Sequence, residues 1–314
     1  MRRLGSQCDR TNLLSVQALD TKYPRAEVQV GVDLVQRLLR EQHPDLAELK
    51  ITLVDVGWDN VTHRVGDELA VRMPRREAAV QLLLKEQRWL STLADWIDIP
   101  VPRLVRAGRP SSAFRWPWSV VQWLPGQTCD VTPLSADQAQ VLGLNLRRLH
   151  RRAPPDAPTN PSRGVPLQQR DEFVQTCLEA LSHSISAHRG DSLRWLWSDG
   201  LRAPKSELSV WLHGDLHPRN VLSRGGLLSG ILDWGDLASG DPATDLASAW
   251  MLFDGREAPS AVFESYGASP ALALRARSWA VFFGAALSNT EDARHLSIGR
   301  RIIDRLVRHA ERDT

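Results

Sequence analysis

Long apolar runs and cysteines are both scarce in this sequence. The chain contains no stretch of about 18 apolar residues, so we expect no membrane-spanning helix. Its first residues, MRRLGSQCDRTNLL, are basic but lack an apolar run and a small-residue cleavage site, so we expect no secretory signal. The three cysteines are widely spaced and form no CxxC motif, which argues against a disulfide framework or a structural zinc site. These absences favour a cytoplasmic protein with no membrane partner.

A strong net charge is also absent. The 39 basic and 37 acidic residues nearly cancel, which leaves a net charge of +2 and predicts no broad nucleic-acid-binding surface. Hydrophobic residues make up 42% of the chain and charged residues 24%, as in ordinary soluble globular proteins. With 314 residues, the chain is long enough for one large domain or two modest ones.

The N-terminal part of the chain predicts a small, mostly antiparallel sheet with one long helix. Residues 1–25 show no periodicity and predict a loosely attached tail. Apolar residues recur at helical spacing over 28–42, until Pro44 ends the helix. Alternating patterns predict strands, two of them joined by a tight turn at Gly66 and Asp67. The predicted elements are strands at 49–58, 61–65 and 68–73, a helix at 75–96, and two more strands up to Gly126.

The remainder of the chain predicts a mainly helical domain. Helices are expected over 135–152, with Ser135 as N-cap, over 171–188, and from Asp241, with Pro242 in the first turn. The other segments are a proline-rich loop at 153–166, two short strands around a polar loop at 210–236, and helices through the C-terminal third. The sequence therefore predicts an α+β fold with a tail at 1–25, a first domain at 26–124 and a second domain at 125–314.

The segment HGDLHPRN, residues 213–220, contains the clearest candidates for chemistry. His213, Asp215 and His217 alternate, and on a strand they would lie on one face as metal ligands, as in a metal-dependent phosphoesterase. Such a two-metal site needs further ligands, and no GNHD or GNHE motif occurs. Pro218 also argues against an extended strand here. The phosphoesterase is therefore kept only as an alternative.

The spacing of Asp215 and Asn220 instead matches the catalytic loop of phosphotransfer enzymes. In such a loop the Asp receives the acceptor hydroxyl and the Asn holds a divalent metal ion. A second acidic ligand is expected just after a nearby strand, and Asp233 ends the apolar segment that follows a diglycine turn. Oxygen ligands combined with nucleotide phosphates suit Mg²⁺. We interpret His213 as a buried scaffold of this loop and His217 as part of the loop structure.

Arg72 and Glu86 are candidates for a phosphate-binding pair. Arg72 follows the alternation of a predicted strand, and Glu86 lies on the apolar face of the helix at 75–96. We expect the two to be paired, because an unpaired buried charge costs several kcal/mol. A solvated Glu86 at the edge of that face is the alternative. Weaker candidates for contact with the nucleotide lie in the loop before Arg72: Gly57, Trp58, Asp59 and Asn60. Gly57 would let the backbone approach a phosphate, but a single glycine does not make a glycine-rich loop.

With these motifs, the chain resembles the aminoglycoside phosphotransferases, which are antibiotic kinases with the two-lobed protein-kinase fold. The resemblance rests on HGDLHPRN (213–220), ILDWGD (231–236) and GDPATDLA (240–247), supported by LAVRMPR (69–75) and KEQRWL (85–90). It implies a small N-lobe built on an antiparallel sheet, for nucleotide binding, and a larger, mainly helical C-lobe with the catalytic loop.

The resemblance also implies roles for individual residues. Asp215 matches the catalytic aspartate, and Asn220 and Asp233 match the Mg²⁺ ligands. Arg72 stands where many relatives have Lys, and Glu86 matches its helix partner. The further matches are Asp241 and Asp245, as acids that brace the catalytic loop, and a hinge at Gln122, Trp123 and Leu124, whose backbone would bind the purine.

The resulting hypothesis is a small-molecule kinase that transfers the γ-phosphoryl group of ATP or GTP to a hydroxyl of an antibiotic. An aminoglycoside is the expected acceptor on family grounds. A macrolide or a metabolite is an alternative, and a nucleotide-binding pseudoenzyme is an alternative of another class. A polycationic acceptor would need carboxylates, and a macrolide an apolar slot. The candidate carboxylates are Asp171, Glu172, Asp191, Asp254 and Glu257, and the candidate apolar residues are Trp250, Met251, Phe253, Trp279, Phe282 and Phe283.

Overall fold

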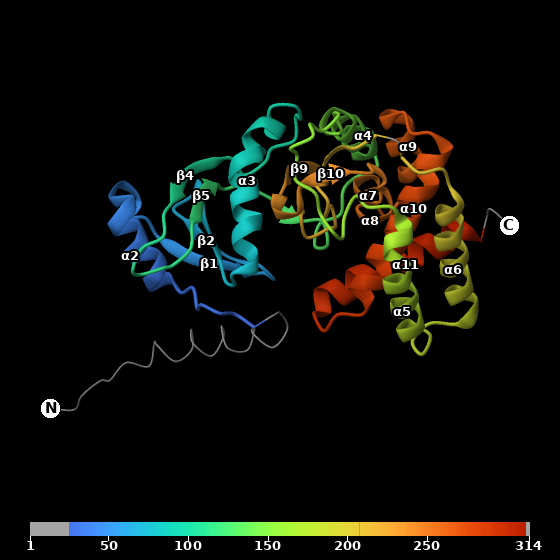
Figure 1. Cartoon of the computed structure of the whole chain (residues 1–314), viewed down its shortest axis with the longest axis horizontal. Coiled ribbons are helices and arrows are strands. Elements are labelled where there is room, and N and C mark those ends of the chain that lie inside the picture. The colour runs from blue at the N-terminus through green and yellow to red at the C-terminus, as the bar shows by residue number, and fades with distance from the viewer. Residues whose placement is uncertain (1–24, 207, 312–314) are drawn as a thin grey trace. The chain divides into compact units, whose positions relative to one another are not determined.

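The contacts of the chain divide it into two compact units, whose elements are labelled in Figure 1. The computed structural model describes residues 25–206 and 208–311, so almost all of the predicted tail lies outside the described residues. The first unit consists of the described residues up to Gln87 and of Arg103–Trp123; the second consists of Arg88–Pro102 and of those from Leu124 onward. The sequence predicts two domains that are each continuous in the chain and meet at residue 124. In the structure, residues 88–102 also belong to the second unit.

A five-stranded antiparallel sheet forms the first unit, with the strand order β1-β2-β3-β5-β4. Gly66 has a φ of 59° in the tight turn between β2 and β3, a conformation that glycine adopts at little cost. The predicted sheet is confirmed, with shorter strands. The elements are β1 (Ile51–Val56), β2 (Asn60–Val65), β3 (Leu69–Pro74), β4 (Leu104–Gly108), β5 (Trp118–Gln122), α2 (Val32–Gln42), a 3-10 turn (Pro44–Leu46) and α3 (Ala78–Ala94), which continues into the second unit.

Alternation along β3 separates the apolar core of the first unit from a polar face. Val71 and Met73 are fully buried and belong to one apolar cluster with Leu38 of α2. Each such side chain contributes about 1.5–3 kcal/mol through removal from water. Arg72 lies between them and projects to the opposite face, as strand geometry requires, where it contacts Glu86 of α3. The sheet thus buries a core on one face and holds a cation on the other.

The second unit is mainly helical, as predicted, and two small sheets support its polar loop. β7 (Val210–Leu212) pairs with β10 (Ala238–Gly240), and β6 (Gln127–Thr128), β8 (Val221–Arg224) and β9 (Leu227–Ile231) form the other sheet. The sequence patterns missed β6 and β10, which are too short to show alternation. The helices are α4 (Gln138–Leu149), α5 (Asp171–Leu181), α6 (Ala187–Arg202), α7 (Ala243–Leu246), α8 (Ser248–Met251), α9 (Ala258–Tyr266), α10 (Pro270–Ser288) and α11 (Ala293–Ala310), with 3-10 turns at Leu167–Arg170 and Trp234–Asp236.

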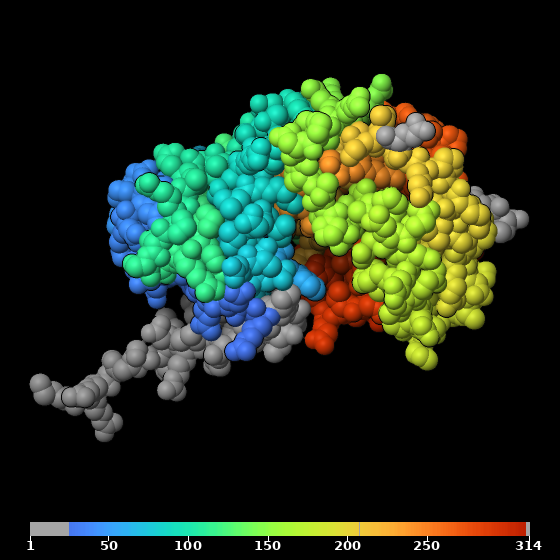
Figure 2. All heavy atoms as spheres, viewed as in Figure 1, coloured from blue at the N-terminus to red at the C-terminus, as the bar shows by residue number. Residues whose placement is uncertain are grey.

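Helix α10 forms the centre of the second unit. It packs against α5, α6, α7 and α11, and its aromatic residues Trp279, Phe282 and Phe283 are buried. The space-filling view shows α5 and α6, in yellow-green and yellow, on the surface of this unit (Figure 2). In the described part of the chain, no helix combines the length and apolar character needed to cross a membrane.

The prediction of a single helix over 171–188 is wrong. The structure has two helices there, α5 and α6, separated by a serine-rich turn. The hydroxyl groups of Ser182 and Ser184 donate to carbonyls of the last turn of α5, local hydrogen bonds that compete with continuation of the helix. Ser186 then caps α6, because its Oγ accepts from a backbone N–H of the first turn.

Two predicted helix starts also differ from the structure. Ser135 is not an N-cap, because α4 begins only at Gln138; its N–H donates instead to the carbonyl of Gly226, at 2.9 Å, in the turn between β8 and β9. The helix expected from Asp241 is divided into the two short helices α7 and α8. The carboxylate of Asp241 does accept from the N–H of Ala243, at 3.1 Å, so the start of α7 is capped from this position.

Gly108 provides a test of the packing in the first unit. An added Cβ would lie 1.9 Å from the buried ring of Trp118. Gly108→Ala is therefore expected to lower the free energy of unfolding by about 1–3 kcal/mol, the usual cost of overpacking. Urea unfolding followed by tryptophan fluorescence measures the change. Gly31→Ala is the control, because nothing lies within 4 Å of its added Cβ; equal losses in the two variants would contradict the packing described here.

Candidate active site

The segment 213–220 forms a loop between β7 and β8 and not an extended strand. Backbone N–H groups of His217 and Asn220 donate to the carbonyls of Asp215 and His217, each at 2.9 Å, so the chain turns twice within the segment. Gly214 has a φ of 91°, and an added Cβ would lie 2.6 Å from a backbone oxygen. The geometry of alternating metal ligands on one strand face is therefore not formed.

Asp245 fixes the start of this loop. Its two carboxylate oxygens accept from the backbone N–H groups of His213, at 2.7 Å, and Gly214, at 2.8 Å. The side chain is fully buried, and its Oδ2 lies 3.2 Å from Nε2 of His150. A carboxylate that receives two backbone N–H groups in the interior is strongly bound to them, because charged acceptors make stronger hydrogen bonds than neutral ones.

His213 joins the loop to the end of β9. Its ring Nε2 lies 2.8 Å from the carbonyl oxygen of Leu232, and its Nδ1 lies 3.1 Å from the backbone nitrogen of Asp215. The carbonyl needs a donor and the N–H needs an acceptor, which assigns the neutral tautomer protonated on Nε2. The buried imidazole thus holds Asp215 in a fixed place relative to the residue before Asp233.

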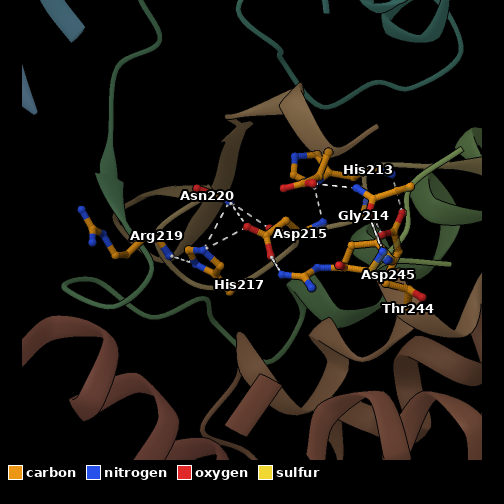
Figure 3. Close-up of polar contacts among 12 residues, drawn as sticks. His213, Gly214, Asp215, His217, Arg219, Asn220, Thr244 and Asp245 are labelled. Carbon is orange, nitrogen blue, oxygen red and sulfur yellow. Dashed lines mark hydrogen bonds and ion pairs between the residues drawn. The ribbon is translucent and has the colours of Figure 1, made fainter. Parts of the chain in front are cut away.

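Asp215 and Asn220 lie side by side at the centre of the loop (Figure 3). Asn220 Nδ2 donates to the backbone oxygen of Asp215 at 2.9 Å and to its Oδ2 at 3.2 Å. These two bonds turn the amide oxygen of Asn220 away from Asp215. On the other side, Oδ1 of Asp215 lies 3.2 Å from Nη2 of Arg163.

Asp233 lies next to Asn220 across the hairpin of β8 and β9. Val221 pairs with Ile231, and the N–H of Leu232 donates to the carbonyl of Asn220 at 2.7 Å. Asp233 is exposed and, among the described residues that are not glycine, it is the one with a positive φ, 56°. Such a conformation costs on the order of 1–3 kcal/mol and is concentrated at functional sites. The structure therefore brings the three predicted polar residues of the second unit to one end of this hairpin.

These residues provide a suitable ligand set for Mg²⁺. The amide oxygen of Asn220 and the exposed carboxylate of Asp233 are hard oxygen donors, the kind that Mg²⁺ prefers together with water and phosphate oxygens. In the described ranges, no group of three or more His, Cys, Asp and Glu side chains could hold a metal ion. The ligand-rich two-metal site that the phosphoesterase alternative requires is thus not formed by the described residues.

His217 takes part in the structure of the loop. Its Nδ1 accepts from the N–H of Arg219 at 3.2 Å, and its Nε2 lies 3.4 Å from Oδ2 of Asp215. Its ring packs edge-on against His295, with 5.6 Å between ring centroids. His295 belongs to the first turn of α11, which is capped by Asp292. The loop is therefore attached to the start of α11 as well as to β9.

Three residues near Asp215 were not predicted from the sequence: Asn160, Arg163 and Asp236. Asn160 Nδ2 donates to Oδ1 of Asp236 at 2.7 Å. Asn160 and Arg163 belong to the segment 153–166, whose prolines indicate only a loop. Asp236 could have been found, because it follows Asp233 by three residues, one turn of a short helix, in the quoted motif ILDWGD.

Asp215 and Asp236 experience opposite electrostatic effects. Burial raises the pKa of Asp215, but His217 and Arg163 outweigh burial and hold this pKa well below its usual range. Burial raises the pKa of Asp236, and the negative charge of Asp215 raises it further. Asp215 is therefore ionised at neutral pH, and Asp236 is the carboxyl that retains a proton more readily.

Asp241 is bound to α10. Its carboxylate accepts from Nε of Arg275 at 2.6 Å and from Nη2 at 3.2 Å, and both side chains are buried. Bidentate pairs of this kind fix orientation as well as charge. Asp241 therefore connects the end of β10 to α10, one turn before Asp245.

In the first unit, Arg72 and Glu86 form the expected ion pair. Nη1 of Arg72 lies 2.6 and 2.7 Å from the two carboxylate oxygens of Glu86, and both residues are buried. The alternative of a solvated Glu86 is therefore wrong. The carboxylate holds the guanidinium on the α3 side of the sheet, where β3 alternation directs it.

The weaker nucleotide-binding candidates are held by contacts within the first unit. The N–H of Gly57 donates to the carbonyl of Asn60 at 2.9 Å, and the carboxylate of Asp59 pairs with Arg76 at 2.5 Å. Trp58 is 45% exposed. At the predicted hinge, the N–H groups of Gln122 and Trp123 donate to Arg103 and Glu68, while Leu124 begins the second unit.

Comparison with known proteins defines the class of the chain. The fold and the loop together are those of a phosphotransfer enzyme, and the sequence profile of the phosphotransferase enzyme family matches residues 50–279. The chain therefore belongs to the phosphotransferase enzyme family. The prediction of a phosphotransferase with an alcohol group as acceptor is confirmed at the level of this family. Among curated proteins, no significant match was found.

Several solved structures share the fold. The GDP complex of aminoglycoside 2'-phosphotransferase-IIIa has a TM-score of 0.64 at 19% sequence identity, and the match covers 88% of this chain and 98% of the chain in that structure. The macrolide 2'-phosphotransferase from Brachybacterium faecium has a TM-score of 0.56 at 21% identity, with coverages of 87% and 98%. An ADP-bound aminoglycoside phosphotransferase has a TM-score of 0.53 at 15% identity, with coverages of 88% and 98%. The predicted kinase-like fold is confirmed.

Asp245→Asn tests how the loop is held. The amide keeps the shape of the carboxylate but presents its NH₂ group to one of the two backbone donors, which then loses its acceptor. We expect a loss of about 1–3 kcal/mol in the free energy of unfolding, the cost of an unsatisfied buried donor. Hydrogen exchange should show faster exchange of the amides of residues 213–215. Asp191→Asn, at an exposed position of α6, is the control; unchanged exchange in Asp245→Asn would show that this carboxylate does not hold the loop.

Proposed function

We propose that the protein is a small-molecule kinase, which transfers the γ-phosphoryl group of ATP or GTP to a hydroxyl of an organic acceptor. The observation that carries this function is the placement of Asp215, Asn220 and Asp233 at one end of the β8–β9 hairpin. Solved relatives of the same fold are complexes with GDP and ADP, which supports a nucleotide as co-substrate.

Asp215 would orient the acceptor hydroxyl. Its lowered pKa keeps it ionised, so it accepts a hydrogen bond from the hydroxyl and is a weak base. A weak base suffices, because phosphoryl transfer passes through a loose transition state in which the nucleophile needs little activation. The proton would move to the Asp215 carboxylate late in the reaction. The bonds from His213 and Asn220 hold the carboxylate in place for this role.

Asn220 and Asp233 would hold Mg²⁺, which would supply positive charge to neutralise the nucleotide phosphates. The Nδ2 of Asn220 is occupied by Asp215, so its amide oxygen is the atom offered to the metal ion. Asp233 has a left-handed backbone and is exposed at the end of the hairpin, next to Asn220. His213 would keep the metal ligands and Asp215 in register, since it contacts both segments.

Arg72 would contribute positive charge to the nucleotide phosphates. Its guanidinium is oriented by Glu86 and offers a planar fork of donors, where a lysine would offer a point charge. The N–H groups of Gln122 and Trp123 are already hydrogen-bonded within the first unit, so the next residue, Leu124, is the candidate for a hydrogen bond to the purine. The candidates for covering the phosphates are Gly57, Trp58, Asp59 and Asn60.

Three of the five carboxylates considered for an aminoglycoside acceptor are engaged by other side chains. Asp171 accepts from Nε1 of Trp197 at 2.7 Å, Asp254 pairs with Arg305, and Asp191 pairs with Arg194 at 3.4 Å. The solved relatives include enzymes named for aminoglycosides and for macrolides, so both acceptor classes, as well as a metabolite, belong in the first assay.

Substitutions of the loop test the proposed function. Asp215→Asn and Asp233→Ala are expected to lower kcat for Mg²⁺-dependent phosphoryl transfer by at least about 10³-fold, because each removes charge that acts on the reacting groups. An assay of nucleotide consumption over a panel of antibiotics and sugars measures this. Glu48→Gln, an isosteric change at an exposed position of the first unit, is the control. Full activity of a folded Asp215→Asn variant would reject the role of Asp215, and tight nucleotide binding without any turnover would identify a pseudoenzyme.

Glu86→Ala tests the phosphate-binding pair. Without the carboxylate, the Arg72 guanidinium loses its orientation, and we expect KM for the nucleotide to rise by about tenfold, equivalent to about 1.4 kcal/mol. KM for the acceptor should change little. Steady-state kinetics with each substrate varied in turn separates the two constants. A larger rise in KM for the acceptor than for the nucleotide would show that Arg72 and Glu86 do not act on the nucleotide phosphates.

A further inference from the structure

The segment 153–166 is fastened to the region around Asp215. Asn160 is bonded to Asp236, and the N–H of Ser239 donates to the carbonyl of Pro158 at 2.7 Å. The N–H of Gly164 donates to Oγ1 of Thr244 at 3.0 Å, and its carbonyl accepts from the N–H of residue 241 at 2.9 Å. These bonds reach β10 and the start of α7, the same elements that hold the catalytic loop. The segment is therefore part of the framework of the site.

This segment presents Arg163 to Asp215. The guanidinium lies 3.2 Å from Oδ1 of Asp215 and stacks over the rings of Phe282, at 5.1 Å, and Phe283, at 5.0 Å. The Arg163 side chain is 20% exposed, so one edge faces solvent beside the carboxylate that would receive the hydroxyl. Its Nε is buried and has no hydrogen-bond partner among the described residues. This buried atom is not accessible to a ligand, so Arg163 acts at Asp215 through its charge and its Nη2 group.

A second arginine lies on the same aromatic residues. The guanidinium of Arg170 is 4.9 Å from the Phe173 ring and 5.3 Å from the Phe282 ring. Burial lowers the pKa of Arg170, and the positive charge of Arg163 lowers it further, so the two cations are electrostatic neighbours. Phe173 is 41% exposed. Arg163, Arg170, Phe173, Phe282 and Phe283 together form an arginine–aromatic wall beside Asp215.

We propose that the arginine–aromatic wall determines acceptor specificity: it favours hydroxyl compounds with an apolar face and at most one positive charge, and it disfavours polycations. The inference rests on the proposed function, because it takes Asp215 as the residue that receives the hydroxyl. The charge of Arg163 offsets that of Asp215, and Arg170 adds a second positive charge on the same aromatic residues, so an additional cation gains less attraction from Asp215 than it would without the wall. The exposed Phe173 ring and the planar guanidinium groups offer stacking surface to an apolar molecule.

Wild-type kinetics test the wall directly. With Mg²⁺ and nucleotide, kcat/KM for erythromycin, a largely apolar macrolide with one amino group, is expected to exceed that for kanamycin or gentamicin, both polyamines, by at least about 100-fold. Equal or better use of the polyamines overturns the proposal. This ratio needs no variant, so it is decisive even where a substitution unfolds the protein.

The double variant Arg163→Gln with Arg170→Gln identifies the residues responsible. Relative to erythromycin, kcat/KM for kanamycin should rise by about tenfold when both charges are removed. The matched control is Arg194→Gln with Arg202→Gln, two exposed arginines of α6. It removes the same net charge from side chains that pair with Asp191 and Asp199 and not with the wall, and the ratio should stay within about twofold. An equal rise in both double variants would attribute the effect to overall charge and overturn the proposal.

Binding separates failure of the wall from failure of the proposed function. Calorimetry without nucleotide should show kanamycin binding at least about tenfold tighter to the Arg163/Arg170 double variant than to the wild type. Nucleotide hydrolysis that depends on Asp215 reports the kinase site itself. Absent hydrolysis with strengthened kanamycin binding rejects the kinase function and supports the wall. Hydrolysis with unchanged kanamycin binding supports the kinase function and rejects the wall. Tighter binding of kanamycin than of erythromycin to the wild type also rejects the wall.

Discussion

The buried carboxylate of Asp245 is the interaction on which the candidate site depends. A loop between two short strands has no helix or sheet to satisfy its first backbone groups, and buried N–H groups without acceptors are costly. The fully buried carboxylate of Asp245 accepts hydrogen bonds from the backbone N–H groups of His213 and Gly214, one on each oxygen. Because these bonds are charge-assisted, they set the direction in which the loop leaves β7, and with it the position of Asp215.

From this anchor, a chain of local bonds connects the polar residues around Asp215. His213 joins Asp215 to the carbonyl before Asp233, and Asn220 joins the backbone and the carboxylate of Asp215. The same elements hold the segment that carries Arg163. As a result, the Asp215 carboxylate is kept ionised, while the pKa of the neighbouring Asp236 carboxyl is raised. Positioned, fixed charge is what phosphoryl transfer requires of a protein, because little covalent chemistry is left for it to do.

Much of this architecture could be predicted from the sequence, because it depends on short-range patterns. Alternation predicted the sheet and the place of Arg72 on its third strand, and the interval between Asp215 and Asn220 predicted a phosphotransfer loop. The break between α5 and α6 could not be foreseen, because it depends on serine hydroxyl groups that donate hydrogen bonds to carbonyls of the last turn of α5. Arg163 could not be foreseen either, since its contact with Asp215 spans 52 residues and depends on how a proline-rich loop folds back.

The most direct measurement is a crystal structure of the full chain with Mg²⁺ and a non-hydrolysable nucleoside triphosphate analogue. The account predicts a magnesium ion bound by the amide oxygen of Asn220 and the carboxylate of Asp233, in contact with phosphate oxygens, with Asp215 close to the γ-phosphoryl group but facing the acceptor side. A triphosphate bound without contact to these three residues, or a metal ion held elsewhere in the chain, would contradict it.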